Sequence, residues 1–366
     1  MVGNAEQTDA TPARFRVLAI DGGGIRGLIA ARVIARLEQL TTAAAGAERR
    51  IADCFHMVVG TSTGGLLALA VTAPDPERPE RPRLSGEELA HLYVTDGPRI
   101  FGDRLQRLRS LWGWIGPKHS PAGLEEALRT RLGDARLRDA LREVLITSYD
   151  MREPGPHFFK RWRARQSGDR DASMIDVGLA TAAAPTYFPS HGIGEQALVD
   201  GGVFAANPAV AGVVEALKRR DEQPASLSPE ELLVVSLGTG QHEIGQKQSE
   251  VRGWGRIGWI WPRRGTPALL STFLDGQSDA AHHWAEILLN HEPGKAVIAP
   301  ARMGEGPRYW RFQASLERSR GLDDAGPASL AELDGAADRL IAERAAELER
   351  LAERLARLDP LPPDPA

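Results

Sequence analysis

The stretch Gly60-Thr61-Ser62-Thr63-Gly64-Gly65 places one serine between two glycines, each two positions away from it. An apolar, strand-like run, 55–59, precedes this stretch, and a helix-like run, 66–70, follows it. This order predicts a nucleophile elbow, in which Ser62 sits on a tight turn after a strand and presents its hydroxyl. Gly60 and Gly64 would allow backbone torsions that a Cβ forbids. The stretch therefore predicts an α/β fold with a serine poised for nucleophilic attack.

A second glycine-rich stretch, Asp21-Gly22-Gly23-Gly24-Ile25-Arg26-Gly27, follows another strand-like run, 14–20. Apolar residues then recur at helical spacing from Leu28 to Leu37. A loop of this kind exposes unpaired backbone amides at the start of a helix, where the helix dipole favours negative charge. It can therefore hold a phosphate or stabilise a developing oxyanion.

These glycines also allow a nucleotide-binding interpretation, because Gly22, Gly24 and Gly27 fit the G-x-G-x-x-G pattern of dinucleotide sites. Against it, Asp21 precedes the glycines, Arg26 lies among them, and no second strand ending in an acid follows at a distance of about 20 residues. A nucleotide-binding enzyme that uses residues 22–27 as a phosphate cradle is therefore kept as the alternative to an acyl-transfer enzyme.

A third element delivers a carboxylate, because the apolar run 197–199 ends at Asp200, just before two glycines. A serine nucleophile needs a base within hydrogen-bond reach, and a partly buried carboxylate with a raised pKa can accept the hydroxyl proton. None of the nine histidines stands in a recognisable partner motif; we expect His56 and His191 to be structural. A serine and aspartate dyad is favoured over a triad with histidine.

With these three elements in this order, the chain resembles the patatin-like phospholipases, a family of serine lipid acyl hydrolases. The resemblance implies that Ser62 is the nucleophile and Asp200 the base that activates it. It also implies that Gly22, Gly23 and Gly24, with Arg26, form the oxyanion-stabilising loop. Further blocks that look like those of the family are 179–189, Asn207-Pro208 and 236–240, so the resemblance covers roughly 14–324.

Strand-like runs at 144–150, 157–162 and 232–236 alternate with helix-like segments, which predicts an α/β sheet with helices on both faces. The resemblance implies the patatin-like form of this class, a three-layer α/β/α fold with a mostly parallel central sheet. From Ser329 onward, leucines and alanines at helical spacing predict a long amphipathic helix or a pair of helices. We expect four regions in the chain: a flexible N-terminus over 1–13, a catalytic domain over 14–324, a helical segment packed on it over 325–358, and a tail over 359–366.

Composition narrows the class of protein further. The single cysteine, Cys54, excludes an intrachain disulfide and a cysteine metal cluster. A net charge of -4 gives no general attraction to nucleic acid. There is no apolar run of about 18 residues, and the first 13 residues are polar. We therefore expect a cytoplasmic enzyme without metal or cofactor, which reaches membrane phospholipid from the surface and is peripheral to the inner face of the membrane when active.

Three features leave alternatives open. Trp254, Trp259 and Trp261 lie in a glycine-rich segment that is either an interfacial lid or part of the core. The C-terminal helices either pack on the catalytic domain or form a homodimer interface or regulatory element. Some compact bacterial members of the family that the chain resembles act in antiphage defence and are switched on by cyclic dinucleotides, and this resemblance suggests such an activator here. Six arginines cluster in one region and are expected to form a solvated surface: Arg81, Arg83, Arg99, Arg104, Arg107 and Arg109.

Overall fold

A computed structural model describes residues 13–102, 116–218, 227–242, 247–260, 266–290, 307–317 and 321–361. Five parallel strands form the centre of an eight-stranded sheet, in the spatial order β3-β2-β1-β7-β9. Their bounds are β1 (Phe15–Ile20), β2 (Met57–Thr61), β3 (Glu143–Asp150), β7 (Leu232–Leu237) and β9 (Tyr309–Phe312). The antiparallel strands are β4 (Gly155–Lys160), β5 (His191–Ile193) and β6 (Gln196–Asp200). The predicted fold class, a mostly parallel α/β sheet, is confirmed.

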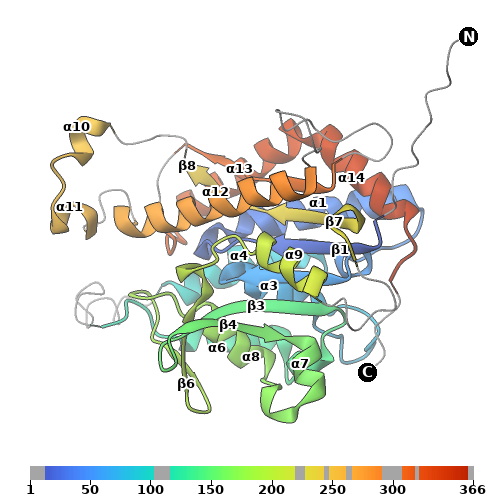
Figure 1. Ribbon diagram of the computed structural model, residues 1–366, viewed down its shortest axis with the longest axis horizontal. Coiled ribbons are helices and arrows are strands. Elements are labelled where there is room, and N and C mark those ends of the chain that lie inside the picture. The colour runs from blue at the N-terminus through green and yellow to red at the C-terminus, as the bar shows by residue number, and fades with distance from the viewer. Residues whose placement is uncertain are drawn as a thin grey trace, which may run out of the picture.

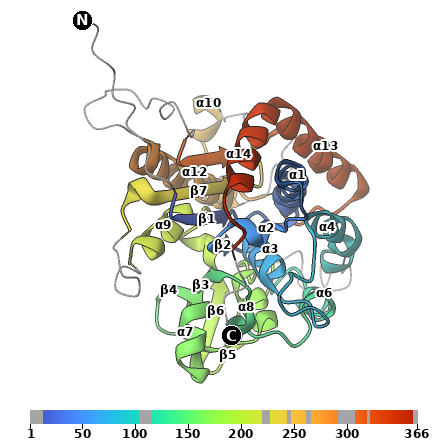
Figure 2. The same ribbon diagram turned by 90° about the vertical axis from the view of Figure 1, so that its right-hand side faces the viewer.

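Helices cover both faces of the sheet, because its strands are apolar on both sides (Figure 2). On β1, Val17 and Ala19 pack toward α9 (Ala209–Lys218) and α12 (Ala268–Asn290). Leu18 and Ile20 point to the opposite face and join the larger core. The helices of that core are α1 (Gly27–Ala45), α3 (Thr63–Thr72), α4 (Gly86–Ile100), α6 (Ala122–Leu132), α8 (Met174–Thr181), α13 (Pro327–Glu343) and α14 (Ala345–Arg357).

The remaining elements are short. They are α2 (Ile51–Cys54), α7 (Arg161–Gln166), α10 (Gln248–Val251), α11 (Arg256–Ile260) and the two-stranded pair β8 (Gln241–His242) and β10 (Ser315–Leu316). Figure 1 shows α10 and α11 at one end of α12, beyond the body of the molecule. The strand expected over 157–162 ends at Lys160, because α7 begins at Arg161.

Local sequence explains where two of the helical units begin and break. Ser85 caps α4, since its hydroxyl accepts from the Glu88 amide while the Glu88 carboxylate accepts from the Ser85 amide. The C-terminal helical region is a pair, because the chain leaves helical geometry at Arg344 between α13 and α14. Both helices pack against α1.

The sheet brings the ends of β2 and β6 together. Residues 145–147 of β3 pair with β4 on one edge and with β2 on the other. Residues 148–150 pair with β4 and, on the edge that β2 occupies, with β6. Strand β2 runs parallel to β3, whereas β6 runs antiparallel to it, so the C-terminal ends of β2 and β6 point toward each other. Strand β2 ends opposite Thr147, and β6 ends opposite the next residue, Ser148. Ser62 follows one of these ends and Asp200 forms the other.

Several sequence-based expectations fall outside the described residues: the flexible N-terminus up to residue 12, the arginines at 104, 107 and 109, Trp261, and the end of the tail from 362. Trp254 and Trp259 are described and half-buried, and their rings meet edge to face at 5.3 Å between centroids. Within the described ranges, none of the helices has the length and apolarity needed to cross a membrane.

Candidate active site

The turn at Ser62 has the strained geometry expected of a nucleophile elbow. Ser62 has φ 54° and ψ -124°, in the left-handed region that residues with a Cβ rarely adopt. Glycines flank it because the chain is crowded there: a Cβ on Gly60 would lie 2.2 Å from the Gly64 carbonyl oxygen, and one on Gly64 would lie 2.1 Å from the Ile20 oxygen. The Ser62 amide donates to the Thr181 hydroxyl at 2.9 Å, which anchors the turn to α8.

Asp200 lies next to this serine. Asp200 is 5 % exposed, and its carboxylate accepts a hydrogen bond from the Gly202 amide at 2.7 Å and lies near the Ser62 hydroxyl, which lowers its pKa as a donor. Burial raises the pKa of the Asp200 carboxyl to about 6, although the Ser62 hydroxyl and the Gly202 amide act in the opposite direction. Ser62 and Asp200 are 138 positions apart in the sequence but lie beside each other at the same cavity. A carboxylate with this pKa can take up a hydroxyl proton near neutral pH.

The glycine loop lies against the same serine. A Cβ on Gly22 would lie 3.3 Å from the Ser62 Cβ, so the bare backbone is needed for this approach. The Gly22 amide is already used, because it donates to the Ala206 carbonyl at 2.9 Å. Among the described residues, the amides of Gly23 and Gly24 have no acceptor. The loop therefore offers two free donors beside Ser62 rather than the three expected from sequence.

Two neighbouring segments force glycine at these positions. A Cβ on Gly23 would lie 2.2 Å from the Thr239 hydroxyl, and one on Gly24, which has φ +58°, would lie 2.2 Å from the Leu322 carbonyl oxygen. The Thr239 hydroxyl donates to the Gly22 carbonyl at 2.7 Å. The Leu322 carbonyl accepts from the Ile25 amide at 2.8 Å. Thr239 and Leu322 therefore hold the glycine loop in place, in addition to the turn that the loop itself forms.

Arg26 points away from the serine. Its guanidinium is buried and donates to the Gly240 carbonyl at 3.3 Å, and it faces a separate small cavity that also contacts His242 and Glu332. It is not among the described residues that line the cavity at Ser62. The side chain of Arg26 therefore supports the 239–240 turn, whereas sequence analysis had expected it at the oxyanion.

The two histidines considered as alternative bases are engaged elsewhere. His56 accepts from the Arg16 amide at 3.0 Å, and burial lowers the pKa of its imidazole to about 3. His191 pairs with Asp176 at 3.0 Å. No histidine is found among the described residues lining the cavity at Ser62. Both act as structural residues, as expected.

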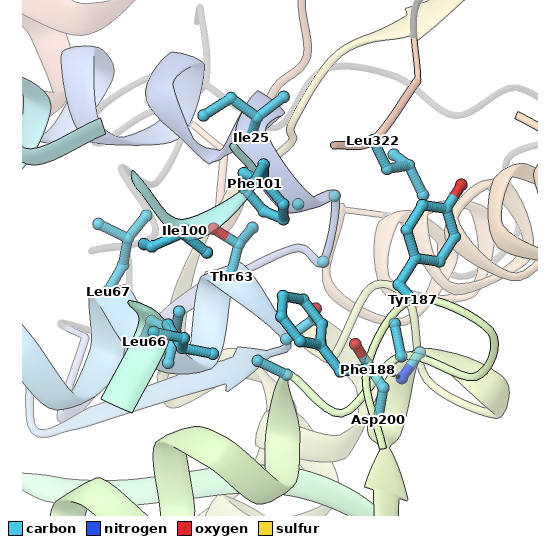
Figure 3. Close-up of a pocket in the computed structure, with 18 of the residues that line it drawn as sticks. Ile25, Thr63, Leu66, Leu67, Ile100, Phe101, Tyr187, Phe188, Asp200 and Leu322 are labelled. Atoms are coloured by element: carbon cyan, nitrogen blue, oxygen red, sulfur yellow. Dashed lines mark hydrogen bonds between the residues drawn. The ribbon is translucent and has the colours of Figure 1, made fainter. Parts of the chain in front are cut away.

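A cavity of about 450 Å³ opens at Ser62 and Asp200, with mostly apolar walls. Figure 3 shows Leu66 and Leu67 of α3 and Ile100 of α4 on one side of it, with Phe188 beside Asp200. Residues of α6 and α12 complete the walls. The sequence does not reveal that α4, α6 and α12 form walls of this cavity, because apolar residues at helical spacing do not indicate which cavity they face. An apolar cavity of this size suits a hydrocarbon chain.

The described residues contain no group of three or more His, Cys, Asp or Glu arranged to hold a metal ion. The groups gathered around Ser62 are instead its own hydroxyl, the Asp200 carboxylate and the free amides of Gly23 and Gly24. This set can perform nucleophilic acyl transfer, since it supplies a nucleophile, a base and oxyanion donors at one point.

Comparison with known proteins agrees with this class of enzyme. The family model of patatin-like phospholipases matches residues 18–213. The chain is 34% identical to patatin-like protein 2 of Arabidopsis thaliana over 287 residues, which cover 72% of this chain and 69% of the relative. It is 37% identical to patatin-03 of Solanum tuberosum over 263 residues, 67% and 66% of the two chains.

The chain therefore belongs to the patatin-like phospholipase family and is a lipid acyl hydrolase, a carboxylic ester hydrolase. Among solved structures, VipD from Legionella pneumophila aligns with 90% of this chain and 67% of its own, with 12% identity and a TM-score of 0.36. That likeness is too low to add to the assignment.

Proposed function

We propose that this protein hydrolyses fatty-acyl esters of glycerophospholipids, with Ser62 as the nucleophile and Asp200 as its base. The observation that carries the proposal is that the Ser62 hydroxyl and the buried Asp200 carboxylate lie next to each other at the wall of one apolar cavity. The buried carboxylate is a stronger base than an exposed one because burial raises its pKa.

The reaction has two steps. Asp200 takes the proton of the Ser62 hydroxyl while the serine oxygen attacks the ester carbonyl carbon. The tetrahedral intermediate collapses to an acyl-serine, and the leaving alcohol takes the proton from Asp200. A water then gives its proton to Asp200 and attacks the acyl-serine, which releases the fatty acid and returns the proton to Ser62.

Each of the two steps passes through a tetrahedral intermediate, and the negative oxygen of that intermediate needs hydrogen-bond donors beside Ser62. The free amides of Gly23 and Gly24 are the proposed donors, since they have no other acceptor among the described residues. Gly22 contributes by having no Cβ against Ser62 and by giving its carbonyl to Thr239. Arg26 contributes indirectly, because it binds the Gly240 carbonyl next to Thr239.

Removing the nucleophile tests this proposal. Ser62→Ala should abolish release of fatty acid from phospholipid vesicles, measured by mass spectrometry of the lipid products. Ser228→Ala is the matched control, because Ser228 starts the short helical turn before β7 and does not line the cavity. Wild-type product profiles from Ser62→Ala would contradict the assignment. The product list also identifies the head group and the acyl position that is cleaved.

We also propose ligand control by a cyclic dinucleotide, as in antiphage effectors, with a polar cleft as the candidate site. This cleft has a volume of about 530 Å³ and is lined by basic and acidic side chains, among them Arg311, Arg344 and Asp279. Arg311 also binds Asp21, which precedes the glycine loop, so a ligand there could act on the oxyanion donors. A thermal-shift and activity screen with cyclic dinucleotides tests this; unchanged melting and constitutive hydrolysis would reject it.

A further inference from the structure

Helix α12 turns large apolar side chains outward. Five of its residues are large, hydrophobic and at least 41% exposed: Leu269, Phe273, Trp284, Ile287 and Leu288. At about 100° per residue they fall within roughly 100° of arc, so they form one stripe on a single side of the helix, with a gap of about 16 Å between Phe273 and Trp284. The stripe extends along most of a helix of 23 residues, which is about 35 Å long.

The buried face of the same helix is made mostly of small residues, with Leu289 and Asn290 buried at its C-terminal end. Ser278, Ala281 and Ala285 are buried, and α12 packs with α9 and β9. A surface helix normally directs its large apolar residues to the core and its polar ones to solvent. Here the small residues let α12 lie close to the body, while the large ones face solvent. Such an exposed apolar surface marks an interaction site.

The stripe is continuous with the opening of the catalytic cavity. Phe273 lines the cavity and is also 59% exposed, and Val203 on the facing turn lines it and is 43% exposed. The Gln277 side chain donates to the Val203 carbonyl at 3.3 Å, so the two sides of the opening are joined. An acyl chain that enters between Phe273 and Val203 passes directly from the stripe to Ser62.

The neighbouring helix α11 also exposes large apolar side chains. Ile257 is 77% exposed and Ile260 is 47% exposed, and α11 packs against α12 (Figure 1). We call these two residues and the five of the α12 stripe the docking face. Among the described residues, seven of the eleven exposed large hydrophobic side chains belong to it.

Charge is arranged to suit a lipid surface. Asp275, Asp279 and Glu286 of α12 lie about 120° or more from the centre of the stripe, on the other side of the helix. The segment 247–260, next to the docking face, has three exposed basic residues, Lys247, Arg252 and Arg256, and one acidic residue, Glu250. Basic residues beside an apolar helix face are typical of helices that lie in the membrane interface.

We propose that the docking face inserts into the surface of a phospholipid bilayer and delivers lipid to the opening between Phe273 and Val203. This inference rests on the proposed function, since it supplies the route of the substrate to Ser62. A second copy of the chain seated on the same face would cover Phe273 and close the opening, which argues against a dimer interface there.

Vesicle flotation tests this docking directly. The 366-residue chain carries Ser62→Ala, so that the vesicles of phosphatidylcholine and phosphatidylglycerol stay intact. Adding Trp284→Gln and Ile287→Gln should lower the bound fraction at least about tenfold, because two apolar side chains no longer enter the bilayer. These residues lie about 16 Å or more along the helix from Phe273 and do not line the cavity.

Activity supplies the second measurement. In the Ser62 background, Trp284→Gln/Ile287→Gln should hydrolyse vesicle phospholipid at least about tenfold more slowly and a short soluble p-nitrophenyl ester at the wild-type rate. Met151→Gln is the matched control, because Met151 is 56% exposed and outside the docking face, and it should leave flotation and both rates unchanged.

The outcomes separate the two proposals. Equal flotation of the Ser62→Ala protein with and without the two glutamines would overturn the docking proposal, whatever the activities are. A wild-type dimer that dissociates in the variant while flotation persists would overturn it in favour of a second copy. If wild type cleaves neither substrate but floats through Trp284 and Ile287, the docking proposal stands and the proposed function fails.

Discussion

The two residues at the centre of the site are each held in an unfavourable state. Ser62 has a positive φ, which costs on the order of 1 to 3 kcal/mol for a residue with a Cβ. Asp200 is a buried acid, and burial raises its pKa to about 6. The surrounding fold stabilises both, and both gain reactivity from it: an exposed hydroxyl for attack and a base that titrates near physiological pH.

The raised pKa of Asp200 gives a prediction with a definite sign. The pKa of an unfolded aspartate is about 3.9, so the folded protein binds more protons between pH 4 and pH 6, and its stability falls as the pH rises through that window. Asp200→Asn removes the ionisation. Above pH 6 its free energy of unfolding should exceed that of wild type by up to about 3 kcal/mol, while near pH 4 the difference should vanish.

Urea unfolding at a series of pH values measures this difference. Hydrolysis by Asp200→Asn should be lost, and wild-type kcat/KM should fall on the acid side with an apparent pKa near 6, because only the ionised carboxylate accepts the serine proton. A variant less stable than wild type at pH 8 would show that Asp200 stabilises the fold in its charged form and would contradict this account.

The oxyanion loop gives a second prediction, with an internal control. Gly24 has a φ of +58°, and Gly24→Ala places a Cβ 2.2 Å from the Leu322 carbonyl oxygen. The loop must therefore move, and its amides no longer point at the oxyanion. We expect kcat to fall on the order of 10² or more. Gly46→Ala has nearly the same φ, +65°, with open space around it, and should cost about 1 kcal/mol of stability with unchanged kcat. Similar kcat values for both variants would show that the loop takes no part in catalysis.

Sequence located the reactive residues but not all of their roles. Ser62, Asp200 and the glycine loop stand out because turns, glycines and apolar runs are local signals. The use of the Gly22 amide by Ala206, and the direction of Arg26 toward Gly240, depend on segments about 180 and 210 residues away. Hydrogen-bond partners at such distances leave no local pattern, so the expectation of an Arg26 charge at the oxyanion could not be checked from the sequence.

At the scale of elements, apolar runs predicted the strands well, with β1, β2, β3 and β7 within a few residues of their observed bounds. They could not predict that β2 and β6 end head-on against β3, because strand order depends on tertiary pairing. Short polar contacts fix that meeting: the Thr61 and Thr147 hydroxyls lie 2.7 Å apart, and the Ser148 hydroxyl donates to the Val199 carbonyl at 2.7 Å.

Thr181 of α8 links this junction to the elbow, which gives a prediction. Its hydroxyl accepts from the Ser62 amide at 2.9 Å and donates to the Thr147 carbonyl at 2.7 Å. Thr181→Val keeps the shape but leaves both partners buried and unpaired, so we expect a loss of about 1 to 3 kcal/mol of stability and a lower kcat with KM little changed.

Thr72→Val is the matched control for this variant. Thr72 is also a buried threonine, but its hydroxyl donates only to carbonyls of its own helix, at Ala68 and Leu69. The loss of stability should be smaller and kcat should be unchanged. Thermal unfolding and steady-state kinetics of the two variants decide the matter; if Thr181→Val has a wild-type kcat, the hydroxyl does not position the serine.

At the scale of the whole molecule, the α/β/α layers follow from apolar strands, but the docking face does not. The apolar residues of α12 recur at helical spacing whether they face a core or a membrane, and the pattern alone gives the period without the direction. From the sequence, the tryptophans of 254–261 are expected either at a membrane contact or in the core. In the structure, Trp254 and Trp259 pack on each other, and the exposed apolar residues are Ile257, Ile260 and the stripe of α12.

One buried ion pair links Asp21, just after β1, to Arg311 of β9. Arg311 of β9 donates to both carboxylate oxygens of Asp21, at 2.9 and 2.6 Å, and also to Ser236 of β7 and Ser278 of α12. The segment before the glycine loop is thus fixed to the sheet and to the helix that carries the docking face. Asp21→Asn or Arg311→Met alone leaves a buried charge unpaired and should cost about 3 to 5 kcal/mol.

A double-mutant cycle measures how strongly this pair couples the two parts of the molecule. The double variant removes both charges, so its loss of stability should be smaller than the sum of the single losses by more than about 1 kcal/mol. The exposed pair Arg32 and Asp338, at 2.6 Å, is the control, and its interaction energy in the same urea experiment should stay below about 1 kcal/mol because solvent screens it. Equal interaction energies for both pairs would show that burial adds nothing to the link between Asp21 and Arg311.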